Sequence, residues 1–141
     1  MQFRSLMVAA AACLLTAGAA QAATVHFSAA LKGADEVPAN TTAGVGKVTA
    51  TLDTATKAFS YEATYSGLTG PAVAAHFHAP AAPGANAPPV VPVTNPANPI
   101  KGTATLTDPQ IADLTAGKWY FNVHTAAHPG GEIRGQLAKA P

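Results

Sequence analysis

Four of the five histidines lie in two short segments of the sequence. They are His76 and His78 in AAHFHAP (residues 74–80), and His124 and His128 in NVHTAAHPGGE (residues 122–132). Neutral imidazole is the commonest protein ligand for copper and zinc. Alternate residues of a strand point to the same side, with Cα atoms roughly 6.5–7 Å apart, so His76 and His78 could bind one ion. Phe77 between them would then enter the core.

The second histidine segment also has the pattern of a strand. In WYFNVH (residues 119–124), Tyr120, Asn122 and His124 share one face. His128 follows in a turn that could fold it back. If the two strands are neighbours, the four histidines predict a metal site with three or four nitrogen ligands. The open alternative is that they are polar residues on the solvent-facing side of an antiparallel sheet.

The first 22 residues have the pattern of a secretory signal peptide. Arg4 is followed by an apolar run over residues 6–15, and Ala20-Gln21-Ala22 fits a signal peptidase site. The apolar run is too short for a membrane span, which needs roughly 20 residues. We therefore expect a periplasmic or secreted protein with one mature domain over residues 23–141 and no membrane span after cleavage.

The only cysteine, Cys13, lies in this leader. A lipoprotein signal is the competing interpretation, but Ala10 stands where the lipobox has leucine. Removal of Cys13 leaves no thiolate ligand, which favours copper, or else zinc, on nitrogen ligands. Seven basic side chains (eight minus Arg4) balance seven acidic ones. This balance argues against nucleic acid or an anionic membrane as the main partner.

His26 lies near the expected mature N-terminus. After cleavage at Ala22 it is the fourth residue and lines a strand face. Cleavage one residue later would create Thr24-Val25-His26, whose amine, amide nitrogens and imidazole form a square-planar copper or nickel site. Gln21 would then occupy a position where signal peptidase prefers a small residue, which disfavours this alternative.

Period-two alternation of apolar and polar residues predicts about seven strands. These strands are residues 24–31, 46–53, 58–68, 71–78, 100–107, 118–125 and 132–139. The proline-rich stretch 79–99 is expected to be an ordered surface loop, with the valines at 90, 91 and 93 able to pack back. One helix is expected in TDPQIADLTAGK, with Asp108 as N-cap and Gly117 as its left-handed end. The fold class is therefore all-β, an antiparallel Greek-key β-sandwich with one short helix.

The remaining polar residues suggest structural roles. Glu132 and Arg134 are predicted to form a cross-strand ion pair, with Glu132 alternatively a hydrogen-bond acceptor behind a ligand histidine. Asp35 and Glu36 are expected to be solvated. The serines have no G-x-S-x-G context, and Gly130-Gly131 precedes a strand, so neither a hydrolase nor a phosphate loop is indicated.

Four segments together resemble the CHRD domain, a module that is repeated in chordin and found singly in exported bacterial proteins. They are FSAALKGADEVPANTTAGVGKVTATLD, FSYEATYSGLTGP, AAHFHAPAAPG and KGTATLTDPQIADLTAGKWYFNVHTAAHPGGEIRGQL. The resemblance runs from Phe27 to Leu137 and implies a secreted β-sandwich. YSGLTGPAVAAHFHAP is also similar to copper/zinc superoxide dismutases, which implies that His76 and His78 match paired copper ligands. The other dismutase features are not found.

These observations lead to three hypotheses. The first is an exported domain that binds a transition metal, with copper as the first choice, through His76, His78 and His124, with His128 as a further ligand. Its role would be binding, buffering or delivery. The second is a metal-free module that presents the proline-rich loop and the sheet edges to a protein or cell-surface partner, with the valines of the loop exposed. The third, a copper-dependent oxidoreductase, rests on the dismutase likeness alone, so an enzyme is less expected than a binding protein.

Overall fold

The computed structural model describes residues 22–141, so the predicted signal peptide, apart from Ala22, lies outside the described residues. The described chain forms nine strands, one α-helix and one short 3-10 helix, which directly follows the first strand. The strands are β1 (Thr24–Lys32), β2 (Val45–Asp53), β3 (Ala58–Ser66), β4 (Ala72–His78), β5 (Pro89–Pro92), β6 (Ile100–Thr105), β7 (Tyr120–Thr125), β8 (Ile133–Gln136) and β9 (Ala138–Lys139). The helices are η1 (Gly33–Asp35) and α1 (Asp108–Thr115).

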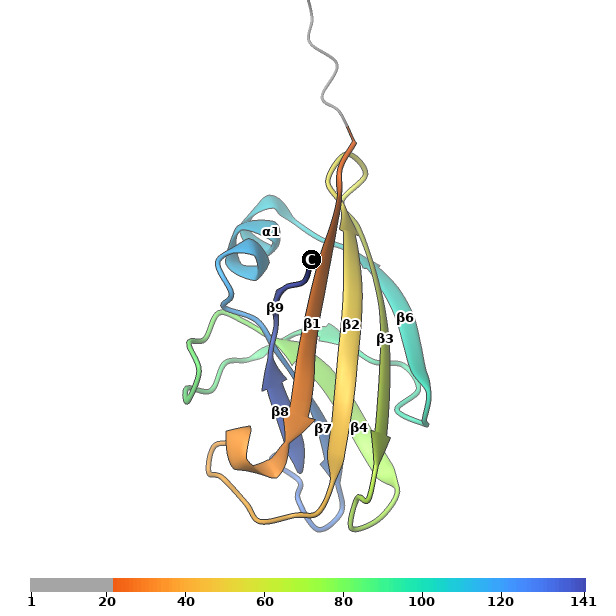
Figure 1. Cartoon of the computed structure of the whole chain (residues 1–141), viewed down its shortest axis with the longest axis vertical. Helices are drawn as coiled ribbons and strands as arrows, with labels where there is room; N and C mark the ends of the chain where they lie inside the picture. Colours follow the sequence, from red (N-terminus) through yellow and green to blue (C-terminus); the bar gives the residue numbers. More distant parts are fainter. Residues whose placement is uncertain (1–21) are drawn as a thin grey trace, which may run out of the picture.

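The strands pair antiparallel in the order β5-β4-β7-β8-β1-β2-β3-β6, with β9 beside β1. In Figure 1, β1, β2, β3 and β6 form one layer, and β4, β7 and β8 lie behind it. The layers join where Lys32 of β1 pairs with Arg134 of β8, so the sheet nearly closes into a barrel. The predicted all-β sandwich with one short helix is confirmed.

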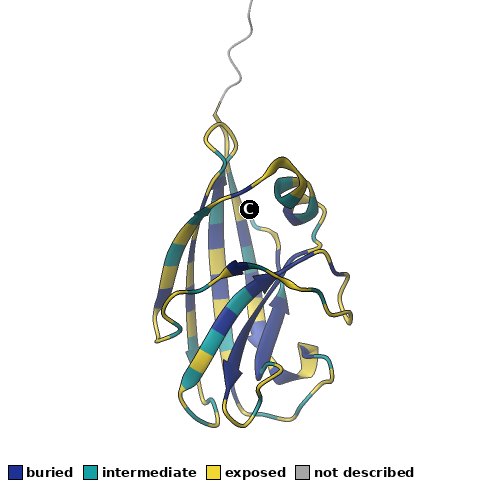
Figure 2. Cartoon of the chain, turned by 180° about the vertical axis from the view of Figure 1, so that it is seen from behind, coloured by how far each residue is buried: buried dark blue, intermediate teal, exposed yellow. Residues whose placement is uncertain are grey.

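An aromatic cluster fills the space between the layers. Phe77 of β4 lies at its centre, with its ring centroid 5.2 Å from Phe59, 4.9 Å from Tyr61 and 4.7 Å from Phe121. Phe77 is fully buried, as its place between two histidines predicts. Buried and exposed residues alternate along β1, β2 and β3, which leaves a polar outer face on this layer (Figure 2). Fixing Phe77 in the core directs its two histidine neighbours to the opposite face of β4.

The proline-rich stretch, residues 79–99, is not a loop over its whole length, contrary to the expectation from the sequence. Residues Pro89–Pro92 form β5, which pairs with β4 through Phe77↔Val91 and His76↔Pro92. β5 is the last strand on its side of the sheet. An edge strand tolerates proline because its outer side has no ladder partner. Val91 is only 5% exposed, so the apolar side of this stretch does pack back onto the core.

The N-terminus of α1 also corrects a prediction. Thr107, not Asp108, is the N-cap: its hydroxyl accepts from the backbone N–H of Gln110, and the Gln110 side chain accepts from the Thr107 N–H. This reciprocal capping box leaves Asp108 in the first turn, where its carboxylate lies 2.8 Å from the Lys57 ammonium. The predicted end is confirmed, since Gly117 has φ of +72° just beyond the helix.

Candidate metal centre

The two histidine segments lie on neighbouring antiparallel strands, β4 and β7. His76 is opposite Asn122, His78 is opposite Tyr120, and Ala74 is opposite His124. This register places the side chains that point away from the aromatic core on one shared face of the two strands. One ring nitrogen from each of His76, His78 and His124 lies within 4.8 Å of the others. These three histidines therefore converge, as the predicted metal site requires.

The spacing between the rings suits one transition-metal ion. His76 Nδ1 lies 3.2 Å from His124 Nε2. Ligand atoms roughly 2.0–2.1 Å from one ion are about 2.8–3.0 Å apart at a right angle and about 3.3–3.4 Å apart at the tetrahedral angle. The observed separation falls within this span. An ion could thus bridge His76 and His124 with little movement of either ring.

Backbone carbonyls hold the outer nitrogens of the two buried rings. His78 Nδ1 lies 2.8 Å from the carbonyl oxygen of Ala87, and His124 Nδ1 lies 2.9 Å from that of Pro129. A carbonyl oxygen can only accept, so each Nδ1 carries the proton and donates it. In a neutral ring, the lone pair is then on Nε2, which faces the centre of the cluster. Hydrogen bonds of this kind commonly fix the tautomer of metal-ligating histidines.

Burial favours the neutral, ligand-competent form of His76 and His78. His78 and His124 are each 8% exposed, and His76 is the more exposed member of the group. Burial lowers the pKa of His76, and the neighbouring rings of His124 and His78 lower it further. Burial also lowers the pKa of His78, and this outweighs the oxygens of Ala87 and Asn122 beside its ring, which raise it. Neutral imidazole, the form that binds metal, is favoured at both positions at neutral pH.

The side chains of Tyr120 and Arg134 stack on one face of the His78 ring. Its ring stacks on Tyr120 with centroids 4.6 Å apart and an interplanar angle of 2°. The Arg134 guanidinium lies 3.3 Å from the centroid of the Tyr120 ring. Arg134 also donates to Asn86 Oδ1 (3.0 Å) and to the Ala85 carbonyl oxygen. Arg134 thereby fixes the loop segment that carries the Ala87 carbonyl.

The predicted ion pair between Glu132 and Arg134 is wrong. Glu132 precedes β8, and its carboxylate accepts hydrogen bonds from Thr42, Thr69 and Thr125 instead. Alternation along a strand does not apply to a residue that lies outside it. Nor does Glu132 support a ligand histidine, since none of these hydrogen bonds involves one.

Glu36 is also placed differently from the expectation. Asp35 is exposed, with its carboxylate 3.6 Å from the Lys32 ammonium, but Glu36 is only 5% exposed. Burial raises the pKa of Glu36 to about 7, although the charge of Arg134, the backbone N–H of Val37 and the nearby Asn122 amide oppose the rise. Glu36 thus lies behind Asn122, which itself lies between the ligand histidines. Asn122 could have been noticed from its shared strand face with His124, whereas Glu36 carries no signal in the sequence.

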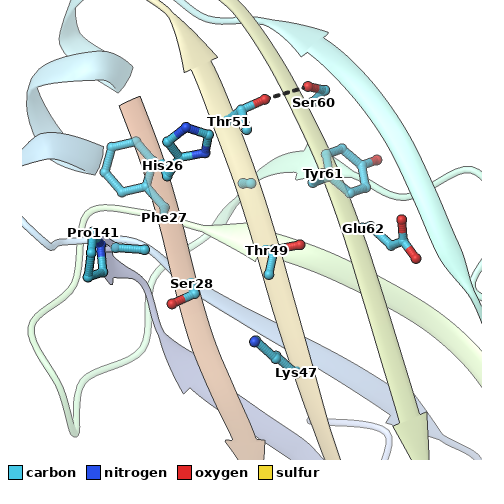
Figure 3. A pocket seen from close by; sticks show the side chains of 12 residues that line it. His26, Phe27, Ser28, Lys47, Thr49, Thr51, Ser60, Tyr61, Glu62 and Pro141 are labelled. Atoms are coloured by element: carbon cyan, nitrogen blue, oxygen red, sulfur yellow. Dashed lines mark hydrogen bonds between the residues drawn. The ribbon is translucent and has the colours of Figure 1, made fainter. Parts of the chain in front are cut away.

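The other two histidines lie apart from the three-histidine group. His128 lines a cavity of about 230 Å³ together with Glu36 and residues of both adjoining loops. Its backbone pairs with Thr125, so the turn folds back as expected, but His128 is not in the group of converging ring nitrogens. His26 projects from β1 beside an open groove of about 630 Å³ over β1, β2 and β3 (Figure 3). Metal binding by either residue stays a prediction.

Helices in the described part of the chain, from Ala22 onward, are all too short or too polar to cross a membrane. Neither the comparison with curated proteins nor the comparison with solved structures gives a match. The comparison with protein families gives one, to the CHRD domain over residues 27–137. This range contains the whole sandwich except its two ends, including both strands of the candidate metal centre. The chain belongs to the CHRD domain family.

Proposed function

We propose that this CHRD domain is an exported protein that binds one copper ion through His76, His78 and His124. The observation that carries the proposal is the convergence of three imidazole nitrogens, each within 4.8 Å of the others. In two of the rings, His78 and His124, Nδ1 donates its proton to a backbone carbonyl oxygen. Nε2 of each neutral ring then carries a lone pair that can bind a metal ion. Nitrogen lone pairs grouped in this way are suited to bind a divalent cation.

Copper is preferred to zinc on ligand chemistry. The group offers imidazole nitrogens and no thiolate, which suits both metals. Divalent copper binds a given nitrogen site more tightly than zinc does. Zinc is therefore the second choice, and a direct competition between the two ions decides the preference.

The proposed role is binding, buffering or delivery in the periplasm or outside the cell. This location rests on the signal-peptide pattern of residues 1–22. Partial exposure of His76 gives an ion a route to the site. The rival role, a partner-binding module that presents exposed valines, loses its support because Val91 is buried and Val90 and Val93 pack against the core.

Isothermal titration of copper(II) and zinc(II) into the mature protein tests the proposal. The N-terminus is first checked by mass spectrometry, because a free amine near His26 could bind copper by itself. We expect one tight copper site that is lost in the His76→Ala/His78→Ala variant. The matched control is His26→Ala/His128→Ala, which removes the same number of imidazoles but should bind copper as the wild type does. Tight binding that disappears in the control and persists in the first variant would overturn the proposal.

A further inference from the structure

The geometry points to Asn122 as a fourth donor of the metal centre, through its side-chain oxygen, and to Glu36 as the residue that orients it. The inference rests on the proposed metal site and deepens it, since it converts three nitrogens into a donor set of three nitrogens and one oxygen. Asn122 lies opposite His76 in the sheet and is 2% exposed. Such a buried amide must have partners for both its oxygen and its nitrogen.

The oxygen of Asn122 faces the inner nitrogens of two ligand histidines. Asn122 Oδ1 lies 2.9 Å from His124 Nε2 and 3.0 Å from His78 Nε2. Both separations fit ligand atoms at about a right angle around one ion, which lie about 2.8–3.0 Å apart. With His76 Nδ1 at 3.2 Å from His124 Nε2, the four possible donor atoms form one cluster.

The hydrogen-bonding capacity of the cluster favours a cation at its centre. His78 and His124 each have an oxygen beside both ring nitrogens, yet a neutral imidazole has one proton to donate. The backbone carbonyls take that proton on the outer side. On the inner side, the Asn122 oxygen therefore faces two nitrogen lone pairs. A cation at the centre would replace these two repulsive contacts with bonds to the Asn122 oxygen and to the two ring nitrogens.

The other side of the amide shows what sets its orientation. Glu36 lies there, only 5% exposed, and its carboxyl group and the Asn122 amide nitrogen both face the space beside Gly131. Gly131 makes room for the pair: a side chain at this position would collide with both the Glu36 carboxylate and the Asn122 amide nitrogen. Glu36 Oε1 has no hydrogen-bond partner among the described residues, and the Asn122 amide nitrogen is a donor that lies on the same side, next to Gly131.

This contact distinguishes the two ends of the amide. In its ionised form the Glu36 carboxylate can only accept, so it favours the orientation that has the amide nitrogen on its own side. The oxygen is thereby directed to the ion. If the amide turned over, its N–H groups would point at the lone pairs of His78 and His124 and compete with the metal. Glu36 is therefore a positioning residue, which acts on the ion through Asn122.

Copper(II) titration and electron paramagnetic resonance of matched variants test this inference. We expect Asn122→Leu, which keeps the volume of the side chain, to lower the copper affinity at least about tenfold and to change the copper hyperfine pattern. Glu36→Met should lower the affinity about 10–100-fold, as loss of an orienting partner does. Glu36→Gln retains an acceptor oxygen for the Asn122 amide and should restore most of the affinity and the wild-type spectrum. Near-ultraviolet circular dichroism checks that each variant is folded.

The wild-type protein provides a test that does not depend on the variants. The side-chain carbonyl carbon of Asn122 should change its NMR shift when one equivalent of zinc(II) is added. An unchanged Asn122 resonance, or wild-type affinity and spectrum in Asn122→Leu, would overturn the inference while leaving the three-histidine site in place. Absence of metal binding by the wild type would overturn both. Equal losses in Glu36→Met and Glu36→Gln would show that Glu36 does not act by orienting the amide.

Discussion

The buried carboxylate of Glu132 allows a stability prediction with a defined pH dependence. Glu132 is fully buried and accepts from the Thr42 hydroxyl at 2.6 Å, from the Thr69 N–H at 2.8 Å and from the Thr69 hydroxyl at 2.7 Å. The Thr125 hydroxyl at the end of β7 donates as well. Glu132 thus ties three segments to the start of β8, close to the strand that carries His124.

The size of this effect follows from the pKa of Glu132. Burial raises it, but the hydrogen bonds from Thr125, Thr42 and Thr69 outweigh burial and lower it from 4.5 to about 2. At about 1.4 kcal/mol per pH unit, this difference corresponds to about 3 kcal/mol of stability at neutral pH. Because the folded-state pKa is the lower one, the contribution is complete above about pH 4.5. It is lost as the pH falls toward about 2.

We expect Glu132→Gln to lower the free energy of unfolding at pH 7 by about 2–3 kcal/mol, and the melting temperature by on the order of 10 °C. Urea denaturation of both proteins between pH 7 and pH 2 measures this difference. It should shrink as the wild-type carboxylate becomes protonated. The matched control is Glu62→Gln, because Glu62 is exposed and its ion pair with Lys101 should contribute at most about 1 kcal/mol. Equal stability of Glu132→Gln and wild type at pH 7, or a difference that does not change with pH, would refute the reasoning.

Three further predictions follow from the positions of single side chains. Thr107→Ala should lower the stability by about 1 kcal/mol in thermal denaturation, because Thr107 is the N-cap of α1. Asp108→Ala should change the stability by at most about 0.5 kcal/mol. A larger loss in Asp108→Ala than in Thr107→Ala would identify Asp108 as the cap. Phe77→Ala should cost about 3–5 kcal/mol in urea denaturation, because Phe77 is fully buried at the centre of the aromatic cluster; a loss below about 1 kcal/mol would contradict this packing. His128→Ala should keep the copper affinity of the wild type in titration, and a tenfold loss would make His128 a ligand.

Most of the sandwich could be predicted because its strands follow a local rule. Alternation of apolar and polar residues marks β1, β2 and β3 directly, and it also places Phe77 inward and its two histidine neighbours outward. The strand β5 was not predicted because its prolines argue against a strand. Proline is nevertheless permitted at the edge of a sheet, where β5 lies. The helix boundary was displaced by one residue because Thr107 and Asp108 are both good capping residues.

The metal centre could be predicted only in part, for a related reason. Pairing of β4 with β7 depends on tertiary topology, so the sequence could state the convergence of His76, His78 and His124 only as a condition. Glu36 lies in a loop far from these histidines in sequence, and its burial depends on how that loop packs over Asn122. Long-range packing of this kind leaves no periodic pattern to read.

X-ray absorption spectroscopy of the mature protein with one equivalent of copper(II) tests the central claim most directly. The account predicts three imidazole nitrogens at roughly 2.0 Å from the copper, together with an oxygen donor. The scattering pattern of the imidazole rings should weaken in the His76→Ala/His78→Ala variant. A site with a single imidazole and backbone amide nitrogens, unchanged in that variant, would place the copper at the N-terminus beside His26 and would contradict the account.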